Sequence, residues 1–108
     1  MRSSNGKSRL AAIETRIEAI KKALLEIGEM RPGSLTRQRR GTRGGYYQLS
    51  YTHKMKGKTE YVRPEYAPTI RKQISAYKRF KKLVEEWVSL GIEHSKTKIK
   101  LAKQTKER

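Results

Sequence analysis

The chain has 108 residues and a formal net charge of +17, and hydrophobic and charged residues each make up 34% of it. This composition supports one small core but not the large interior of an enzyme, and the lack of cysteine excludes disulfides, thiol catalysis and cysteine-bound zinc. The sequence has no run of about 18 apolar residues and no apolar leader, so we expect a cytoplasmic protein with no membrane partner.

The first predicted element is a helix over about 8–30, after a disordered N-terminus at 1–7. Aliphatic residues recur at alternating intervals of three and four positions: Leu10, Ile13, Ile17, Ile20, Leu24 and Ile27. This stripe is typical of a helix face that packs against another helix. Gly28, followed by Pro32 and Gly33, is expected to end the helix.

A small antiparallel sheet of two or three strands is expected over about 34–63. The alternating segment "YYQLSYTHK" predicts a strand. The side chains expected to face the helices are Tyr47, Leu49 and Tyr51. The segment "MKGK" is predicted as the turn, with Gly57 adopting a positive φ, and "TEYVR" as the returning strand. A further strand is expected in Ser34–Arg40, before a glycine-containing loop.

The third predicted element is a long helix over about 65–93. Pro64 suits its first turn, where a missing backbone amide does no harm. Apolar residues recur with helical spacing: Ile70, Ile74, Tyr77, Phe80, Val84 and Trp87. Residues 94–108 are expected to extend this helix or to form a basic tail, and Gly91 is a candidate position for a bend.

Together these elements predict an α+β fold with one α-β-β-α domain over 8–93. It contains an N-terminal helix, a small two- or three-stranded antiparallel sheet and a long C-terminal helix. We expect the two helices to pair as an antiparallel coiled-coil-like hairpin. Because one short helix cannot cover the broad apolar face of a long one, we also expect a homodimer formed through the helices.

A set of motifs runs through the sheet region: "PGSL", "GGYYQLS", "GKT" and "YVRP". From Pro32 to about Glu93 the chain resembles a family of small, basic, uncharacterised prokaryotic proteins. Many members of that family carry a short cysteine cluster that looks like a metal knuckle. This chain has "RQRRGTRGG" at that place, so no metal site is carried over. The occurrence of family members near mobile-element genes implies a DNA context.

No catalytic, cofactor or metal site is expected, and we do not expect an enzyme. The segment Gly57–Thr59 lacks the upstream glycine of a phosphate-binding loop and is flanked by strands. Glu85 and Glu86 are adjacent on a helix and therefore diverge by about 100°. His53 is interpreted as a phosphate contact, and His94 as a helix-surface residue.

Positive charge is concentrated in two segments. Residues 31–64 carry nine basic residues and one acidic residue, and residues 94–108 carry six and one. Arginine suits bidentate phosphate contacts, whereas lysine acts as a mobile point charge. The residues expected to contact nucleic acid are Arg37, Arg39, Arg40, Arg43, His53, Lys54, Lys56, Lys58, Arg63, Lys96, Lys98, Lys100 and Lys103.

These features favour a non-catalytic nucleic-acid-binding protein. Double-stranded DNA is preferred to RNA because a β-hairpin fits the major groove of B-form DNA. Two alternatives stay open: an RNA-binding component of a ribonucleoprotein, and a helical interaction or scaffold protein whose charge is incidental. Salt-dependent binding to duplex DNA would distinguish the DNA-binding hypothesis from the scaffold hypothesis.

Overall fold

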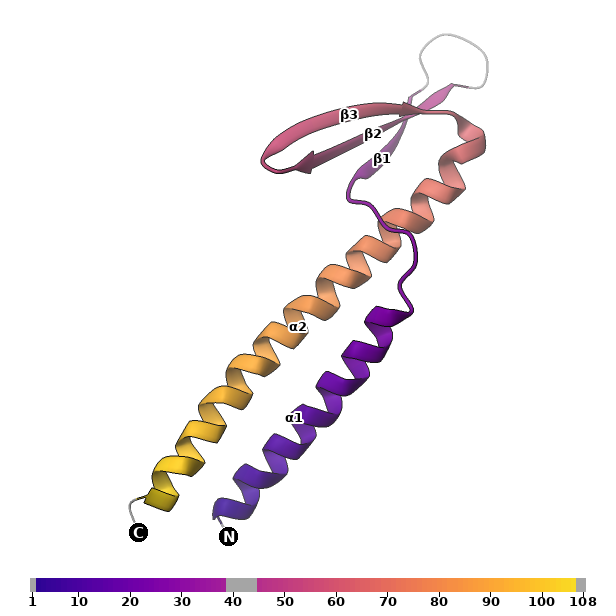
Figure 1. The fold of residues 1–108 in the computed structure, drawn as a ribbon. Helices are drawn as coiled ribbons and strands as arrows, with labels where there is room; N and C mark the ends of the chain where they lie inside the picture. Colours follow the sequence, from indigo (N-terminus) through magenta and orange to yellow (C-terminus); the bar gives the residue numbers. More distant parts are fainter. Residues whose placement is uncertain (1, 39–44, 107–108) are drawn as a thin grey trace. The chain divides into compact units, whose positions relative to one another are not determined.

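The computed structural model describes residues 2–38 and 45–106, and the side chains of 6–38 and 45–105. Its elements in chain order are α1 (Arg2–Leu25), β1 (Ser34–Gln38), β2 (Tyr46–His53), β3 (Lys56–Val62), a short 3-10 helix (Pro64–Tyr66) and α2 (Ala67–Lys106) (Figure 1). The predicted α+β class and order of elements are confirmed, and the sheet has three strands.

The chain divides into two compact units. The helical unit comprises Met1–Glu26 and Lys81–Arg108, and the sheet unit comprises Ile27–Phe80. The sequence predicted one domain over 8–93. Because α2 is a single helix that contributes to both units, its apolar periodicity contains no break that could mark the division.

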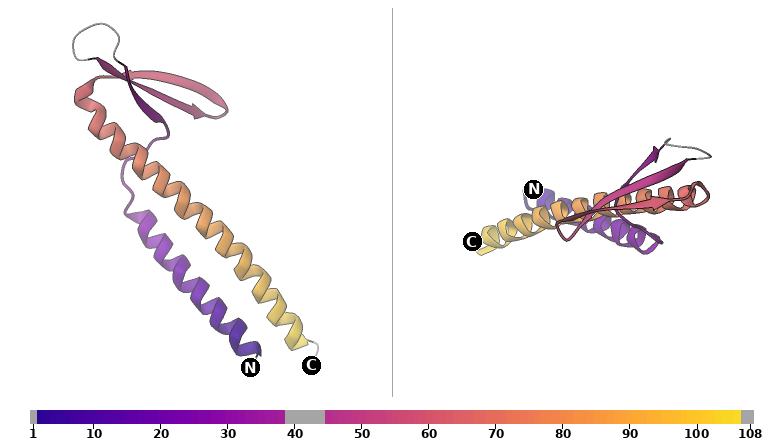
Figure 2. Two further views of the ribbon diagram at one scale, coloured as in Figure 1. Left: turned by 180° about the vertical axis from the view of Figure 1, so that it is seen from behind. Right: turned by 90° about the horizontal axis from the view of Figure 1, so that it is seen from above.

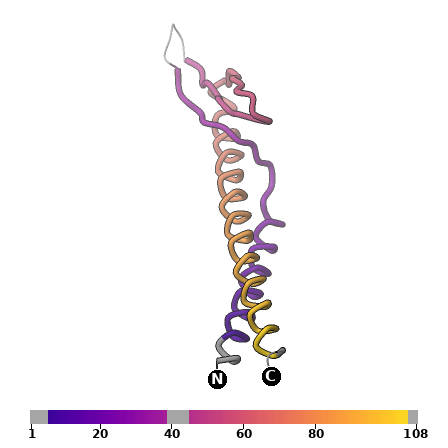
Figure 3. Tube along the Cα trace, turned by 90° about the vertical axis from the view of Figure 1, so that its left-hand side faces the viewer, coloured from indigo at the N-terminus to yellow at the C-terminus, as the bar shows by residue number. Residues whose placement is uncertain are grey.

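In the helical unit, α1 lies antiparallel to the C-terminal part of α2 (Figures 2 and 3). Ile13 and Ile20 are each 1% exposed, which confirms that the predicted stripe packs inside the chain. On α2 the half-buried residues also follow heptad spacing: Leu83, Trp87, Leu90, His94, Thr97 and Leu101. Matched heptad faces are the packing mode of coiled coils, so the predicted helical hairpin is confirmed.

Ion pairs along this hairpin follow the same register. The Arg9 guanidinium donates to Glu93 through Nη2 at 2.7 Å, and the Arg16 guanidinium donates to Glu86 through Nη2 at 2.7 Å. Arg16 follows Arg9 by seven residues on α1, and its partner Glu86 precedes Glu93 by seven residues on α2, as an antiparallel pair of heptad helices requires. These hydrogen bonds are the main reason that the pKa values of Glu86 and Glu93 are lowered.

The ends of α1 differ from the prediction. The helix begins at Arg2, within the segment expected to be disordered, and ends at Leu25 instead of near residue 30. A Cβ atom on Gly6 would lie 2.7 Å from Cδ2 of Leu101, so the bare glycine lets this early turn approach α2 closely. The far end of α2 is also helical, because the helix runs through Gly91 to Lys106.

The sheet unit has strand order β1-β2-β3, with both pairs antiparallel. Its core consists of Leu49, Val62 and Ile74, which are 0%, 8% and 8% exposed. The half-buried hydrophobic residues around this core are Leu35, Tyr47, Tyr51 and Ile70. The predicted packing of the Tyr47, Leu49 and Tyr51 face against the second helix is therefore confirmed.

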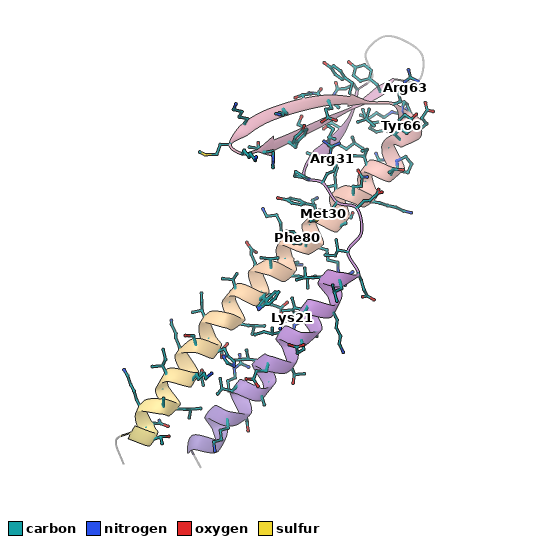
Figure 4. The ribbon with its side chains drawn as sticks, in the orientation of Figure 1. Lys21, Met30, Arg31, Arg63, Tyr66 and Phe80 are labelled. Atoms are coloured by element: carbon teal, nitrogen blue, oxygen red, sulfur yellow. The ribbon has the colours of Figure 1, made fainter. Side chains whose placement is uncertain are left out.

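Arg31 connects three segments of the sheet unit on the α2 side of the strands (Figure 4). Its Nη2 donates to Glu60 Oε2 at 3.1 Å, and its guanidinium lies 5.0 Å from the Tyr51 ring centre. The Tyr51 hydroxyl donates to the same Glu60 oxygen at 2.8 Å. The Arg31 backbone amide donates to the Gln73 carbonyl on α2, so β2, β3, α2 and the segment before β1 are held together.

The hairpin turn between β2 and β3 is not where the sequence placed it. Lys54 and Met55 form the turn with φ values of 52° and 67°, and Gly57 lies inside β3 opposite Thr52. A turn centred on Lys56 and Gly57 would shift the pairing by four residues and move Glu60 away from Leu49 and Tyr51. The core and the Arg31 network therefore outweigh the preference of glycine for positive φ.

Candidate nucleic-acid interface

The sheet has a face without charge. Because side chains alternate along a strand, the residues between those of the core point to the opposite side, here called the outer face. Its members are Ser34, Thr36, Gln38, Tyr46, Gln48, Ser50, Thr52, Thr59 and Tyr61. All nine are uncharged, all carry a hydroxyl or an amide, and none is buried.

The strand register places these groups in rows across the sheet. Thr36, Gln48 and Tyr61 form the central row, since Thr36 pairs with Gln48 and Gln48 pairs with Tyr61. Tyr46 packs edge-on against Tyr61, with ring centres 5.1 Å apart and ring planes at 88°. Tyr61 is nevertheless 72% exposed, so the contact with Tyr46 leaves most of the Tyr61 side chain accessible.

One end of the sheet carries a group of cations, here called the basic tip: His53, Lys54, Lys56 and Lys58. All four side chains are exposed, and His53 pairs with Lys56 directly across the hairpin. The turn between them holds two non-glycine residues in the left-handed region, which is uncommon and strained. The structure thus brings four of the predicted site residues together.

Arg37 and Arg63 lie at the other end of the sheet. Arg37 pairs with Tyr47, Tyr47 pairs with Val62, and Arg63 follows Val62 directly (Figure 4). Both arginines are exposed. Lys56 and Val62 are six residue steps apart along β3, which corresponds to about 20 Å. Basic residues therefore lie at both ends of the sheet, although the same alternation places Arg37, His53, Lys56 and Lys58 on the side of Leu49 and Tyr51.

The remaining predicted site residues are not part of this arrangement. Arg39, Arg40 and Arg43 lie outside the described residues. The lysines predicted in the C-terminal segment are on α2 within the helical unit, where all four are exposed: Lys96, Lys98, Lys100 and Lys103.

The acidic residues of the sheet unit do not lie on the outer face. Glu60 projects to the inner side, where Arg31 is the main cause of its lowered pKa, with Tyr51 contributing next. Glu29 accepts a hydrogen bond from Gln73 of α2 at 3.0 Å, and Glu65 follows the last strand in the 3-10 helix. The carboxylate beside Tyr51 also raises the pKa of that tyrosine. The outer face consequently offers hydrogen-bonding groups without local negative charge.

Reasoning from the sequence identified the cations and missed the outer face as a candidate site. The sequence does contain a signal for this face. Every second residue of β1, β2 and β3, on the outer side, is uncharged, although 34% of the chain is charged. The strand β3 was predicted to begin at Thr59 instead of Lys56, and the pairing register was not specified. Without that register, Thr36, Gln48 and Tyr61 could not be placed side by side.

Other kinds of site find no support in the described part of the chain. Over these residues, no group of three or more histidine, aspartate or glutamate side chains is placed to hold a metal ion. Neither helix, within the same residues, has an apolar stretch of the length needed to cross a bilayer. Comparison with protein-family models, curated proteins and solved structures gives no match to this chain.

Proposed function

We propose that the protein is a non-catalytic, cytoplasmic DNA-binding protein that acts as a homodimer and places the outer face of its sheet in the major groove. The observation that carries this proposal is the charge-free, hydrogen-bonding outer face, in a sheet that has basic residues at both of its ends. A DNA groove has a complementary pattern, with donors and acceptors on its floor and phosphates along its walls.

The side chains of the sheet unit fit two roles: contact with base edges and contact with phosphates. Amide side chains such as Gln48 can donate to and accept from an adenine edge, and the threonine hydroxyls can contact any base. The basic tip and the pair formed by Arg37 and Arg63 would contact phosphates on either side. The α2 lysines in the helical unit would add phosphate contacts without sequence preference. The resemblance to a prokaryotic family associated with mobile elements agrees with DNA as the ligand.

Single-stranded nucleic acid, including RNA, is the second candidate. The observation that favours it is the exposed edge-on pair of Tyr46 and Tyr61, because exposed aromatic rings stack on unpaired bases. Duplex RNA fits less well, since the major groove of the A-form helix is too narrow for a sheet.

Binding as a function of salt tests the proposal. If about six phosphates are neutralised, affinity for duplex DNA should fall roughly 10³-fold between 50 and 200 mM salt. Competition at one salt concentration between duplex DNA, single-stranded DNA and structured RNA would rank the ligands. Affinity that does not change with salt would favour the scaffold alternative, and preferential binding of single strands would favour the second candidate.

A further inference from the structure

A second apolar stripe runs along α2 within the helical unit. Val88, Ile92 and Ile99 are 57%, 53% and 55% exposed, which is unusual for three β-branched residues on one helix. Together with neighbouring positions they form a heptad series, here called the outer stripe: Glu85, Val88, Ile92, Ser95, Ile99 and Ala102. The series extends about 26 Å along the helix.

The outer stripe points away from α1. Ile92 and Leu101 are nine residues apart, which places their side chains about 180° apart around the helix, and the same holds for Leu90 and Ile99. Leu90 and Leu101 belong to the half-buried series of α2. Because α1 packs on that series, the hairpin of the helical unit leaves the outer stripe exposed.

The charged residues beside the outer stripe differ between its two ends. Glu85 lies at one end and Lys103 follows Ala102 at the other, and the series continues to a lysine at each end, Lys81 and Lys106. If two copies pack along this stripe in antiparallel orientation, Val88 lies opposite the partner's Ile99 and Glu85 lies beside the partner's Lys103. A parallel arrangement would instead bring Glu85 against the partner's Glu85, and like charges oppose such pairing.

We propose that the outer stripe of α2 binds a second copy of the chain in antiparallel orientation, with two reciprocal contacts between Glu85 and the partner's Lys103. This inference rests on the homodimer of the proposed function and names its surface. It does not depend on DNA binding. The stripe of α1, which includes Ile17 and Ile20, is used inside the hairpin, where Ile20 is 1% exposed.

A dimer of this kind has a consequence for binding. Each particle would carry two sheet units, so a second sheet unit could contact the same DNA after the first has bound. Such linkage raises the apparent affinity through effective concentration without any new contact. A two-fold arrangement would also favour targets that contain two half-sites.

Cross-linking tests the orientation cleanly, because the natural chain contains no cysteine. A disulfide needs Cα atoms within about 7 Å, and in the antiparallel dimer position 88 would be close to position 99 of the second copy. Two copies of position 88 would lie about 16 Å apart. Under oxidation, a mixture of Val88→Cys and Ile99→Cys chains should give the mixed disulfide, and neither chain should cross-link with itself. Self-cross-linking of Val88→Cys, or no cross-link in the mixture, would overturn the proposal.

Charge exchange tests the contact itself. Glu85→Lys and Lys103→Glu should each weaken self-association about tenfold, since two exposed pairs change from attraction to repulsion, and the double variant should restore it. The measurement is sedimentation of the full chain without nucleic acid, in about 0.3 M salt to reduce long-range repulsion. Glu26→Lys is the matched control, because Glu26 is an exposed residue of α1 in the same unit.

An apolar substitution gives an independent readout of the same surface. Ile92→Asp should weaken self-association on the order of 100-fold, because it buries unpaired charge in the two-fold interface. Leu25→Asp is its control, since Leu25 is 86% exposed at the end of α1 and lies off the stripe. A wild-type chain that stays monomeric would refute the proposed dimer surface and leave the proposal of DNA binding intact. A dimer that does not bind DNA would refute DNA binding and leave the dimer surface intact.

Discussion

The two units of this chain are held together in different ways. In the helical unit, the same kinds of contact recur along the hairpin: aliphatic layers around Ile13 and Ile20, and bidentate ion pairs at Arg9 and Arg16. The sheet unit has one cluster of three buried residues and one polar network around Arg31. Contacts thus repeat along the hairpin, whereas the buried core and the Arg31 network of the sheet unit lie on one side of the sheet, and no residue of the outer face is buried.

The aromatic residues allow the two units to be followed separately. All six tyrosines lie between Tyr46 and Tyr77 in the sheet unit, and the single tryptophan, Trp87, lies in the helical unit. Lys21 is 5.6 Å from the Trp87 ring centre, so α1 contacts this ring. Tyrosine near-ultraviolet circular dichroism therefore reports on the sheet unit, and tryptophan fluorescence reports on the hairpin.

Truncating one core residue in each unit should have the largest effect. Leu49→Ala and Ile20→Ala should each destabilise their own unit by about 2–5 kcal/mol, because both side chains are almost fully buried. With thermal unfolding followed by both signals, Leu49→Ala should mainly shift the tyrosine transition and Ile20→Ala the tryptophan transition. Equal shifts of both transitions in both variants would show that the continuous α2 makes the chain one cooperative unit.

Removing the lysines of the basic tip should have the next largest effect. A Lys54→Ala, Lys56→Ala, Lys58→Ala variant should lose affinity for duplex DNA on the order of 100-fold at about 0.1 M salt, with a salt slope lower by about 3. The control removes three exposed lysines from α2, at Lys72, Lys78 and Lys82. If the control weakens binding as much as the tip variant, net charge explains the effect and the tip is not the site.

Changing the outer face should affect sequence preference and leave salt dependence unchanged. Gln48→Ala should reduce by about tenfold the preference for a duplex selected from a random library over a scrambled duplex, because an amide contact to a base edge is lost. Gln104→Ala on α2 is the matched control. An equal loss of affinity for both duplexes would place Gln48 outside the base-reading surface.

The smallest expected effect concerns pH. Because Arg31 and Tyr51 lower the pKa of Glu60 below its ordinary value of 4.5, their contribution to stability is present above that pH and is lost as pH falls through the lowered pKa. Glu60→Gln should therefore cost the sheet unit about 0.5–1 kcal/mol at neutral pH, a value reduced by the 46% exposure of the side chain. The difference between variant and wild type should shrink below pH 4.5 when followed by the tyrosine signal. A constant difference would show that the network does not depend on the charge of Glu60.

Several features of the fold were predictable from the sequence because local pattern alone determines them. The heptad spacing from Leu10 to Leu24 specifies a helix face, and the alternation around Leu49 specifies a strand with one buried side. Pro64 at the start of the last helical segment was also predictable, since a proline fits a first turn. The cations of the candidate site could be identified in the same way, from their concentration between residues 31 and 64.

Other features were decided only by contacts between distant residues. The approach of Gly6 to Leu101 accompanies the extension of α1 to Arg2, and the pairing of Glu60 with Arg31 and Tyr51 sets a turn at Lys54 and Met55 that no local preference favours. Gly33 adopts a φ of 143° where a Cβ would lie 2.5 Å from Leu49, a requirement that no short sequence window contains. Periodicity tells which residues share a face, because it depends on backbone geometry alone. Only packing decides which face is covered, and hence that the outer face of the sheet and the outer stripe of α2 stay exposed.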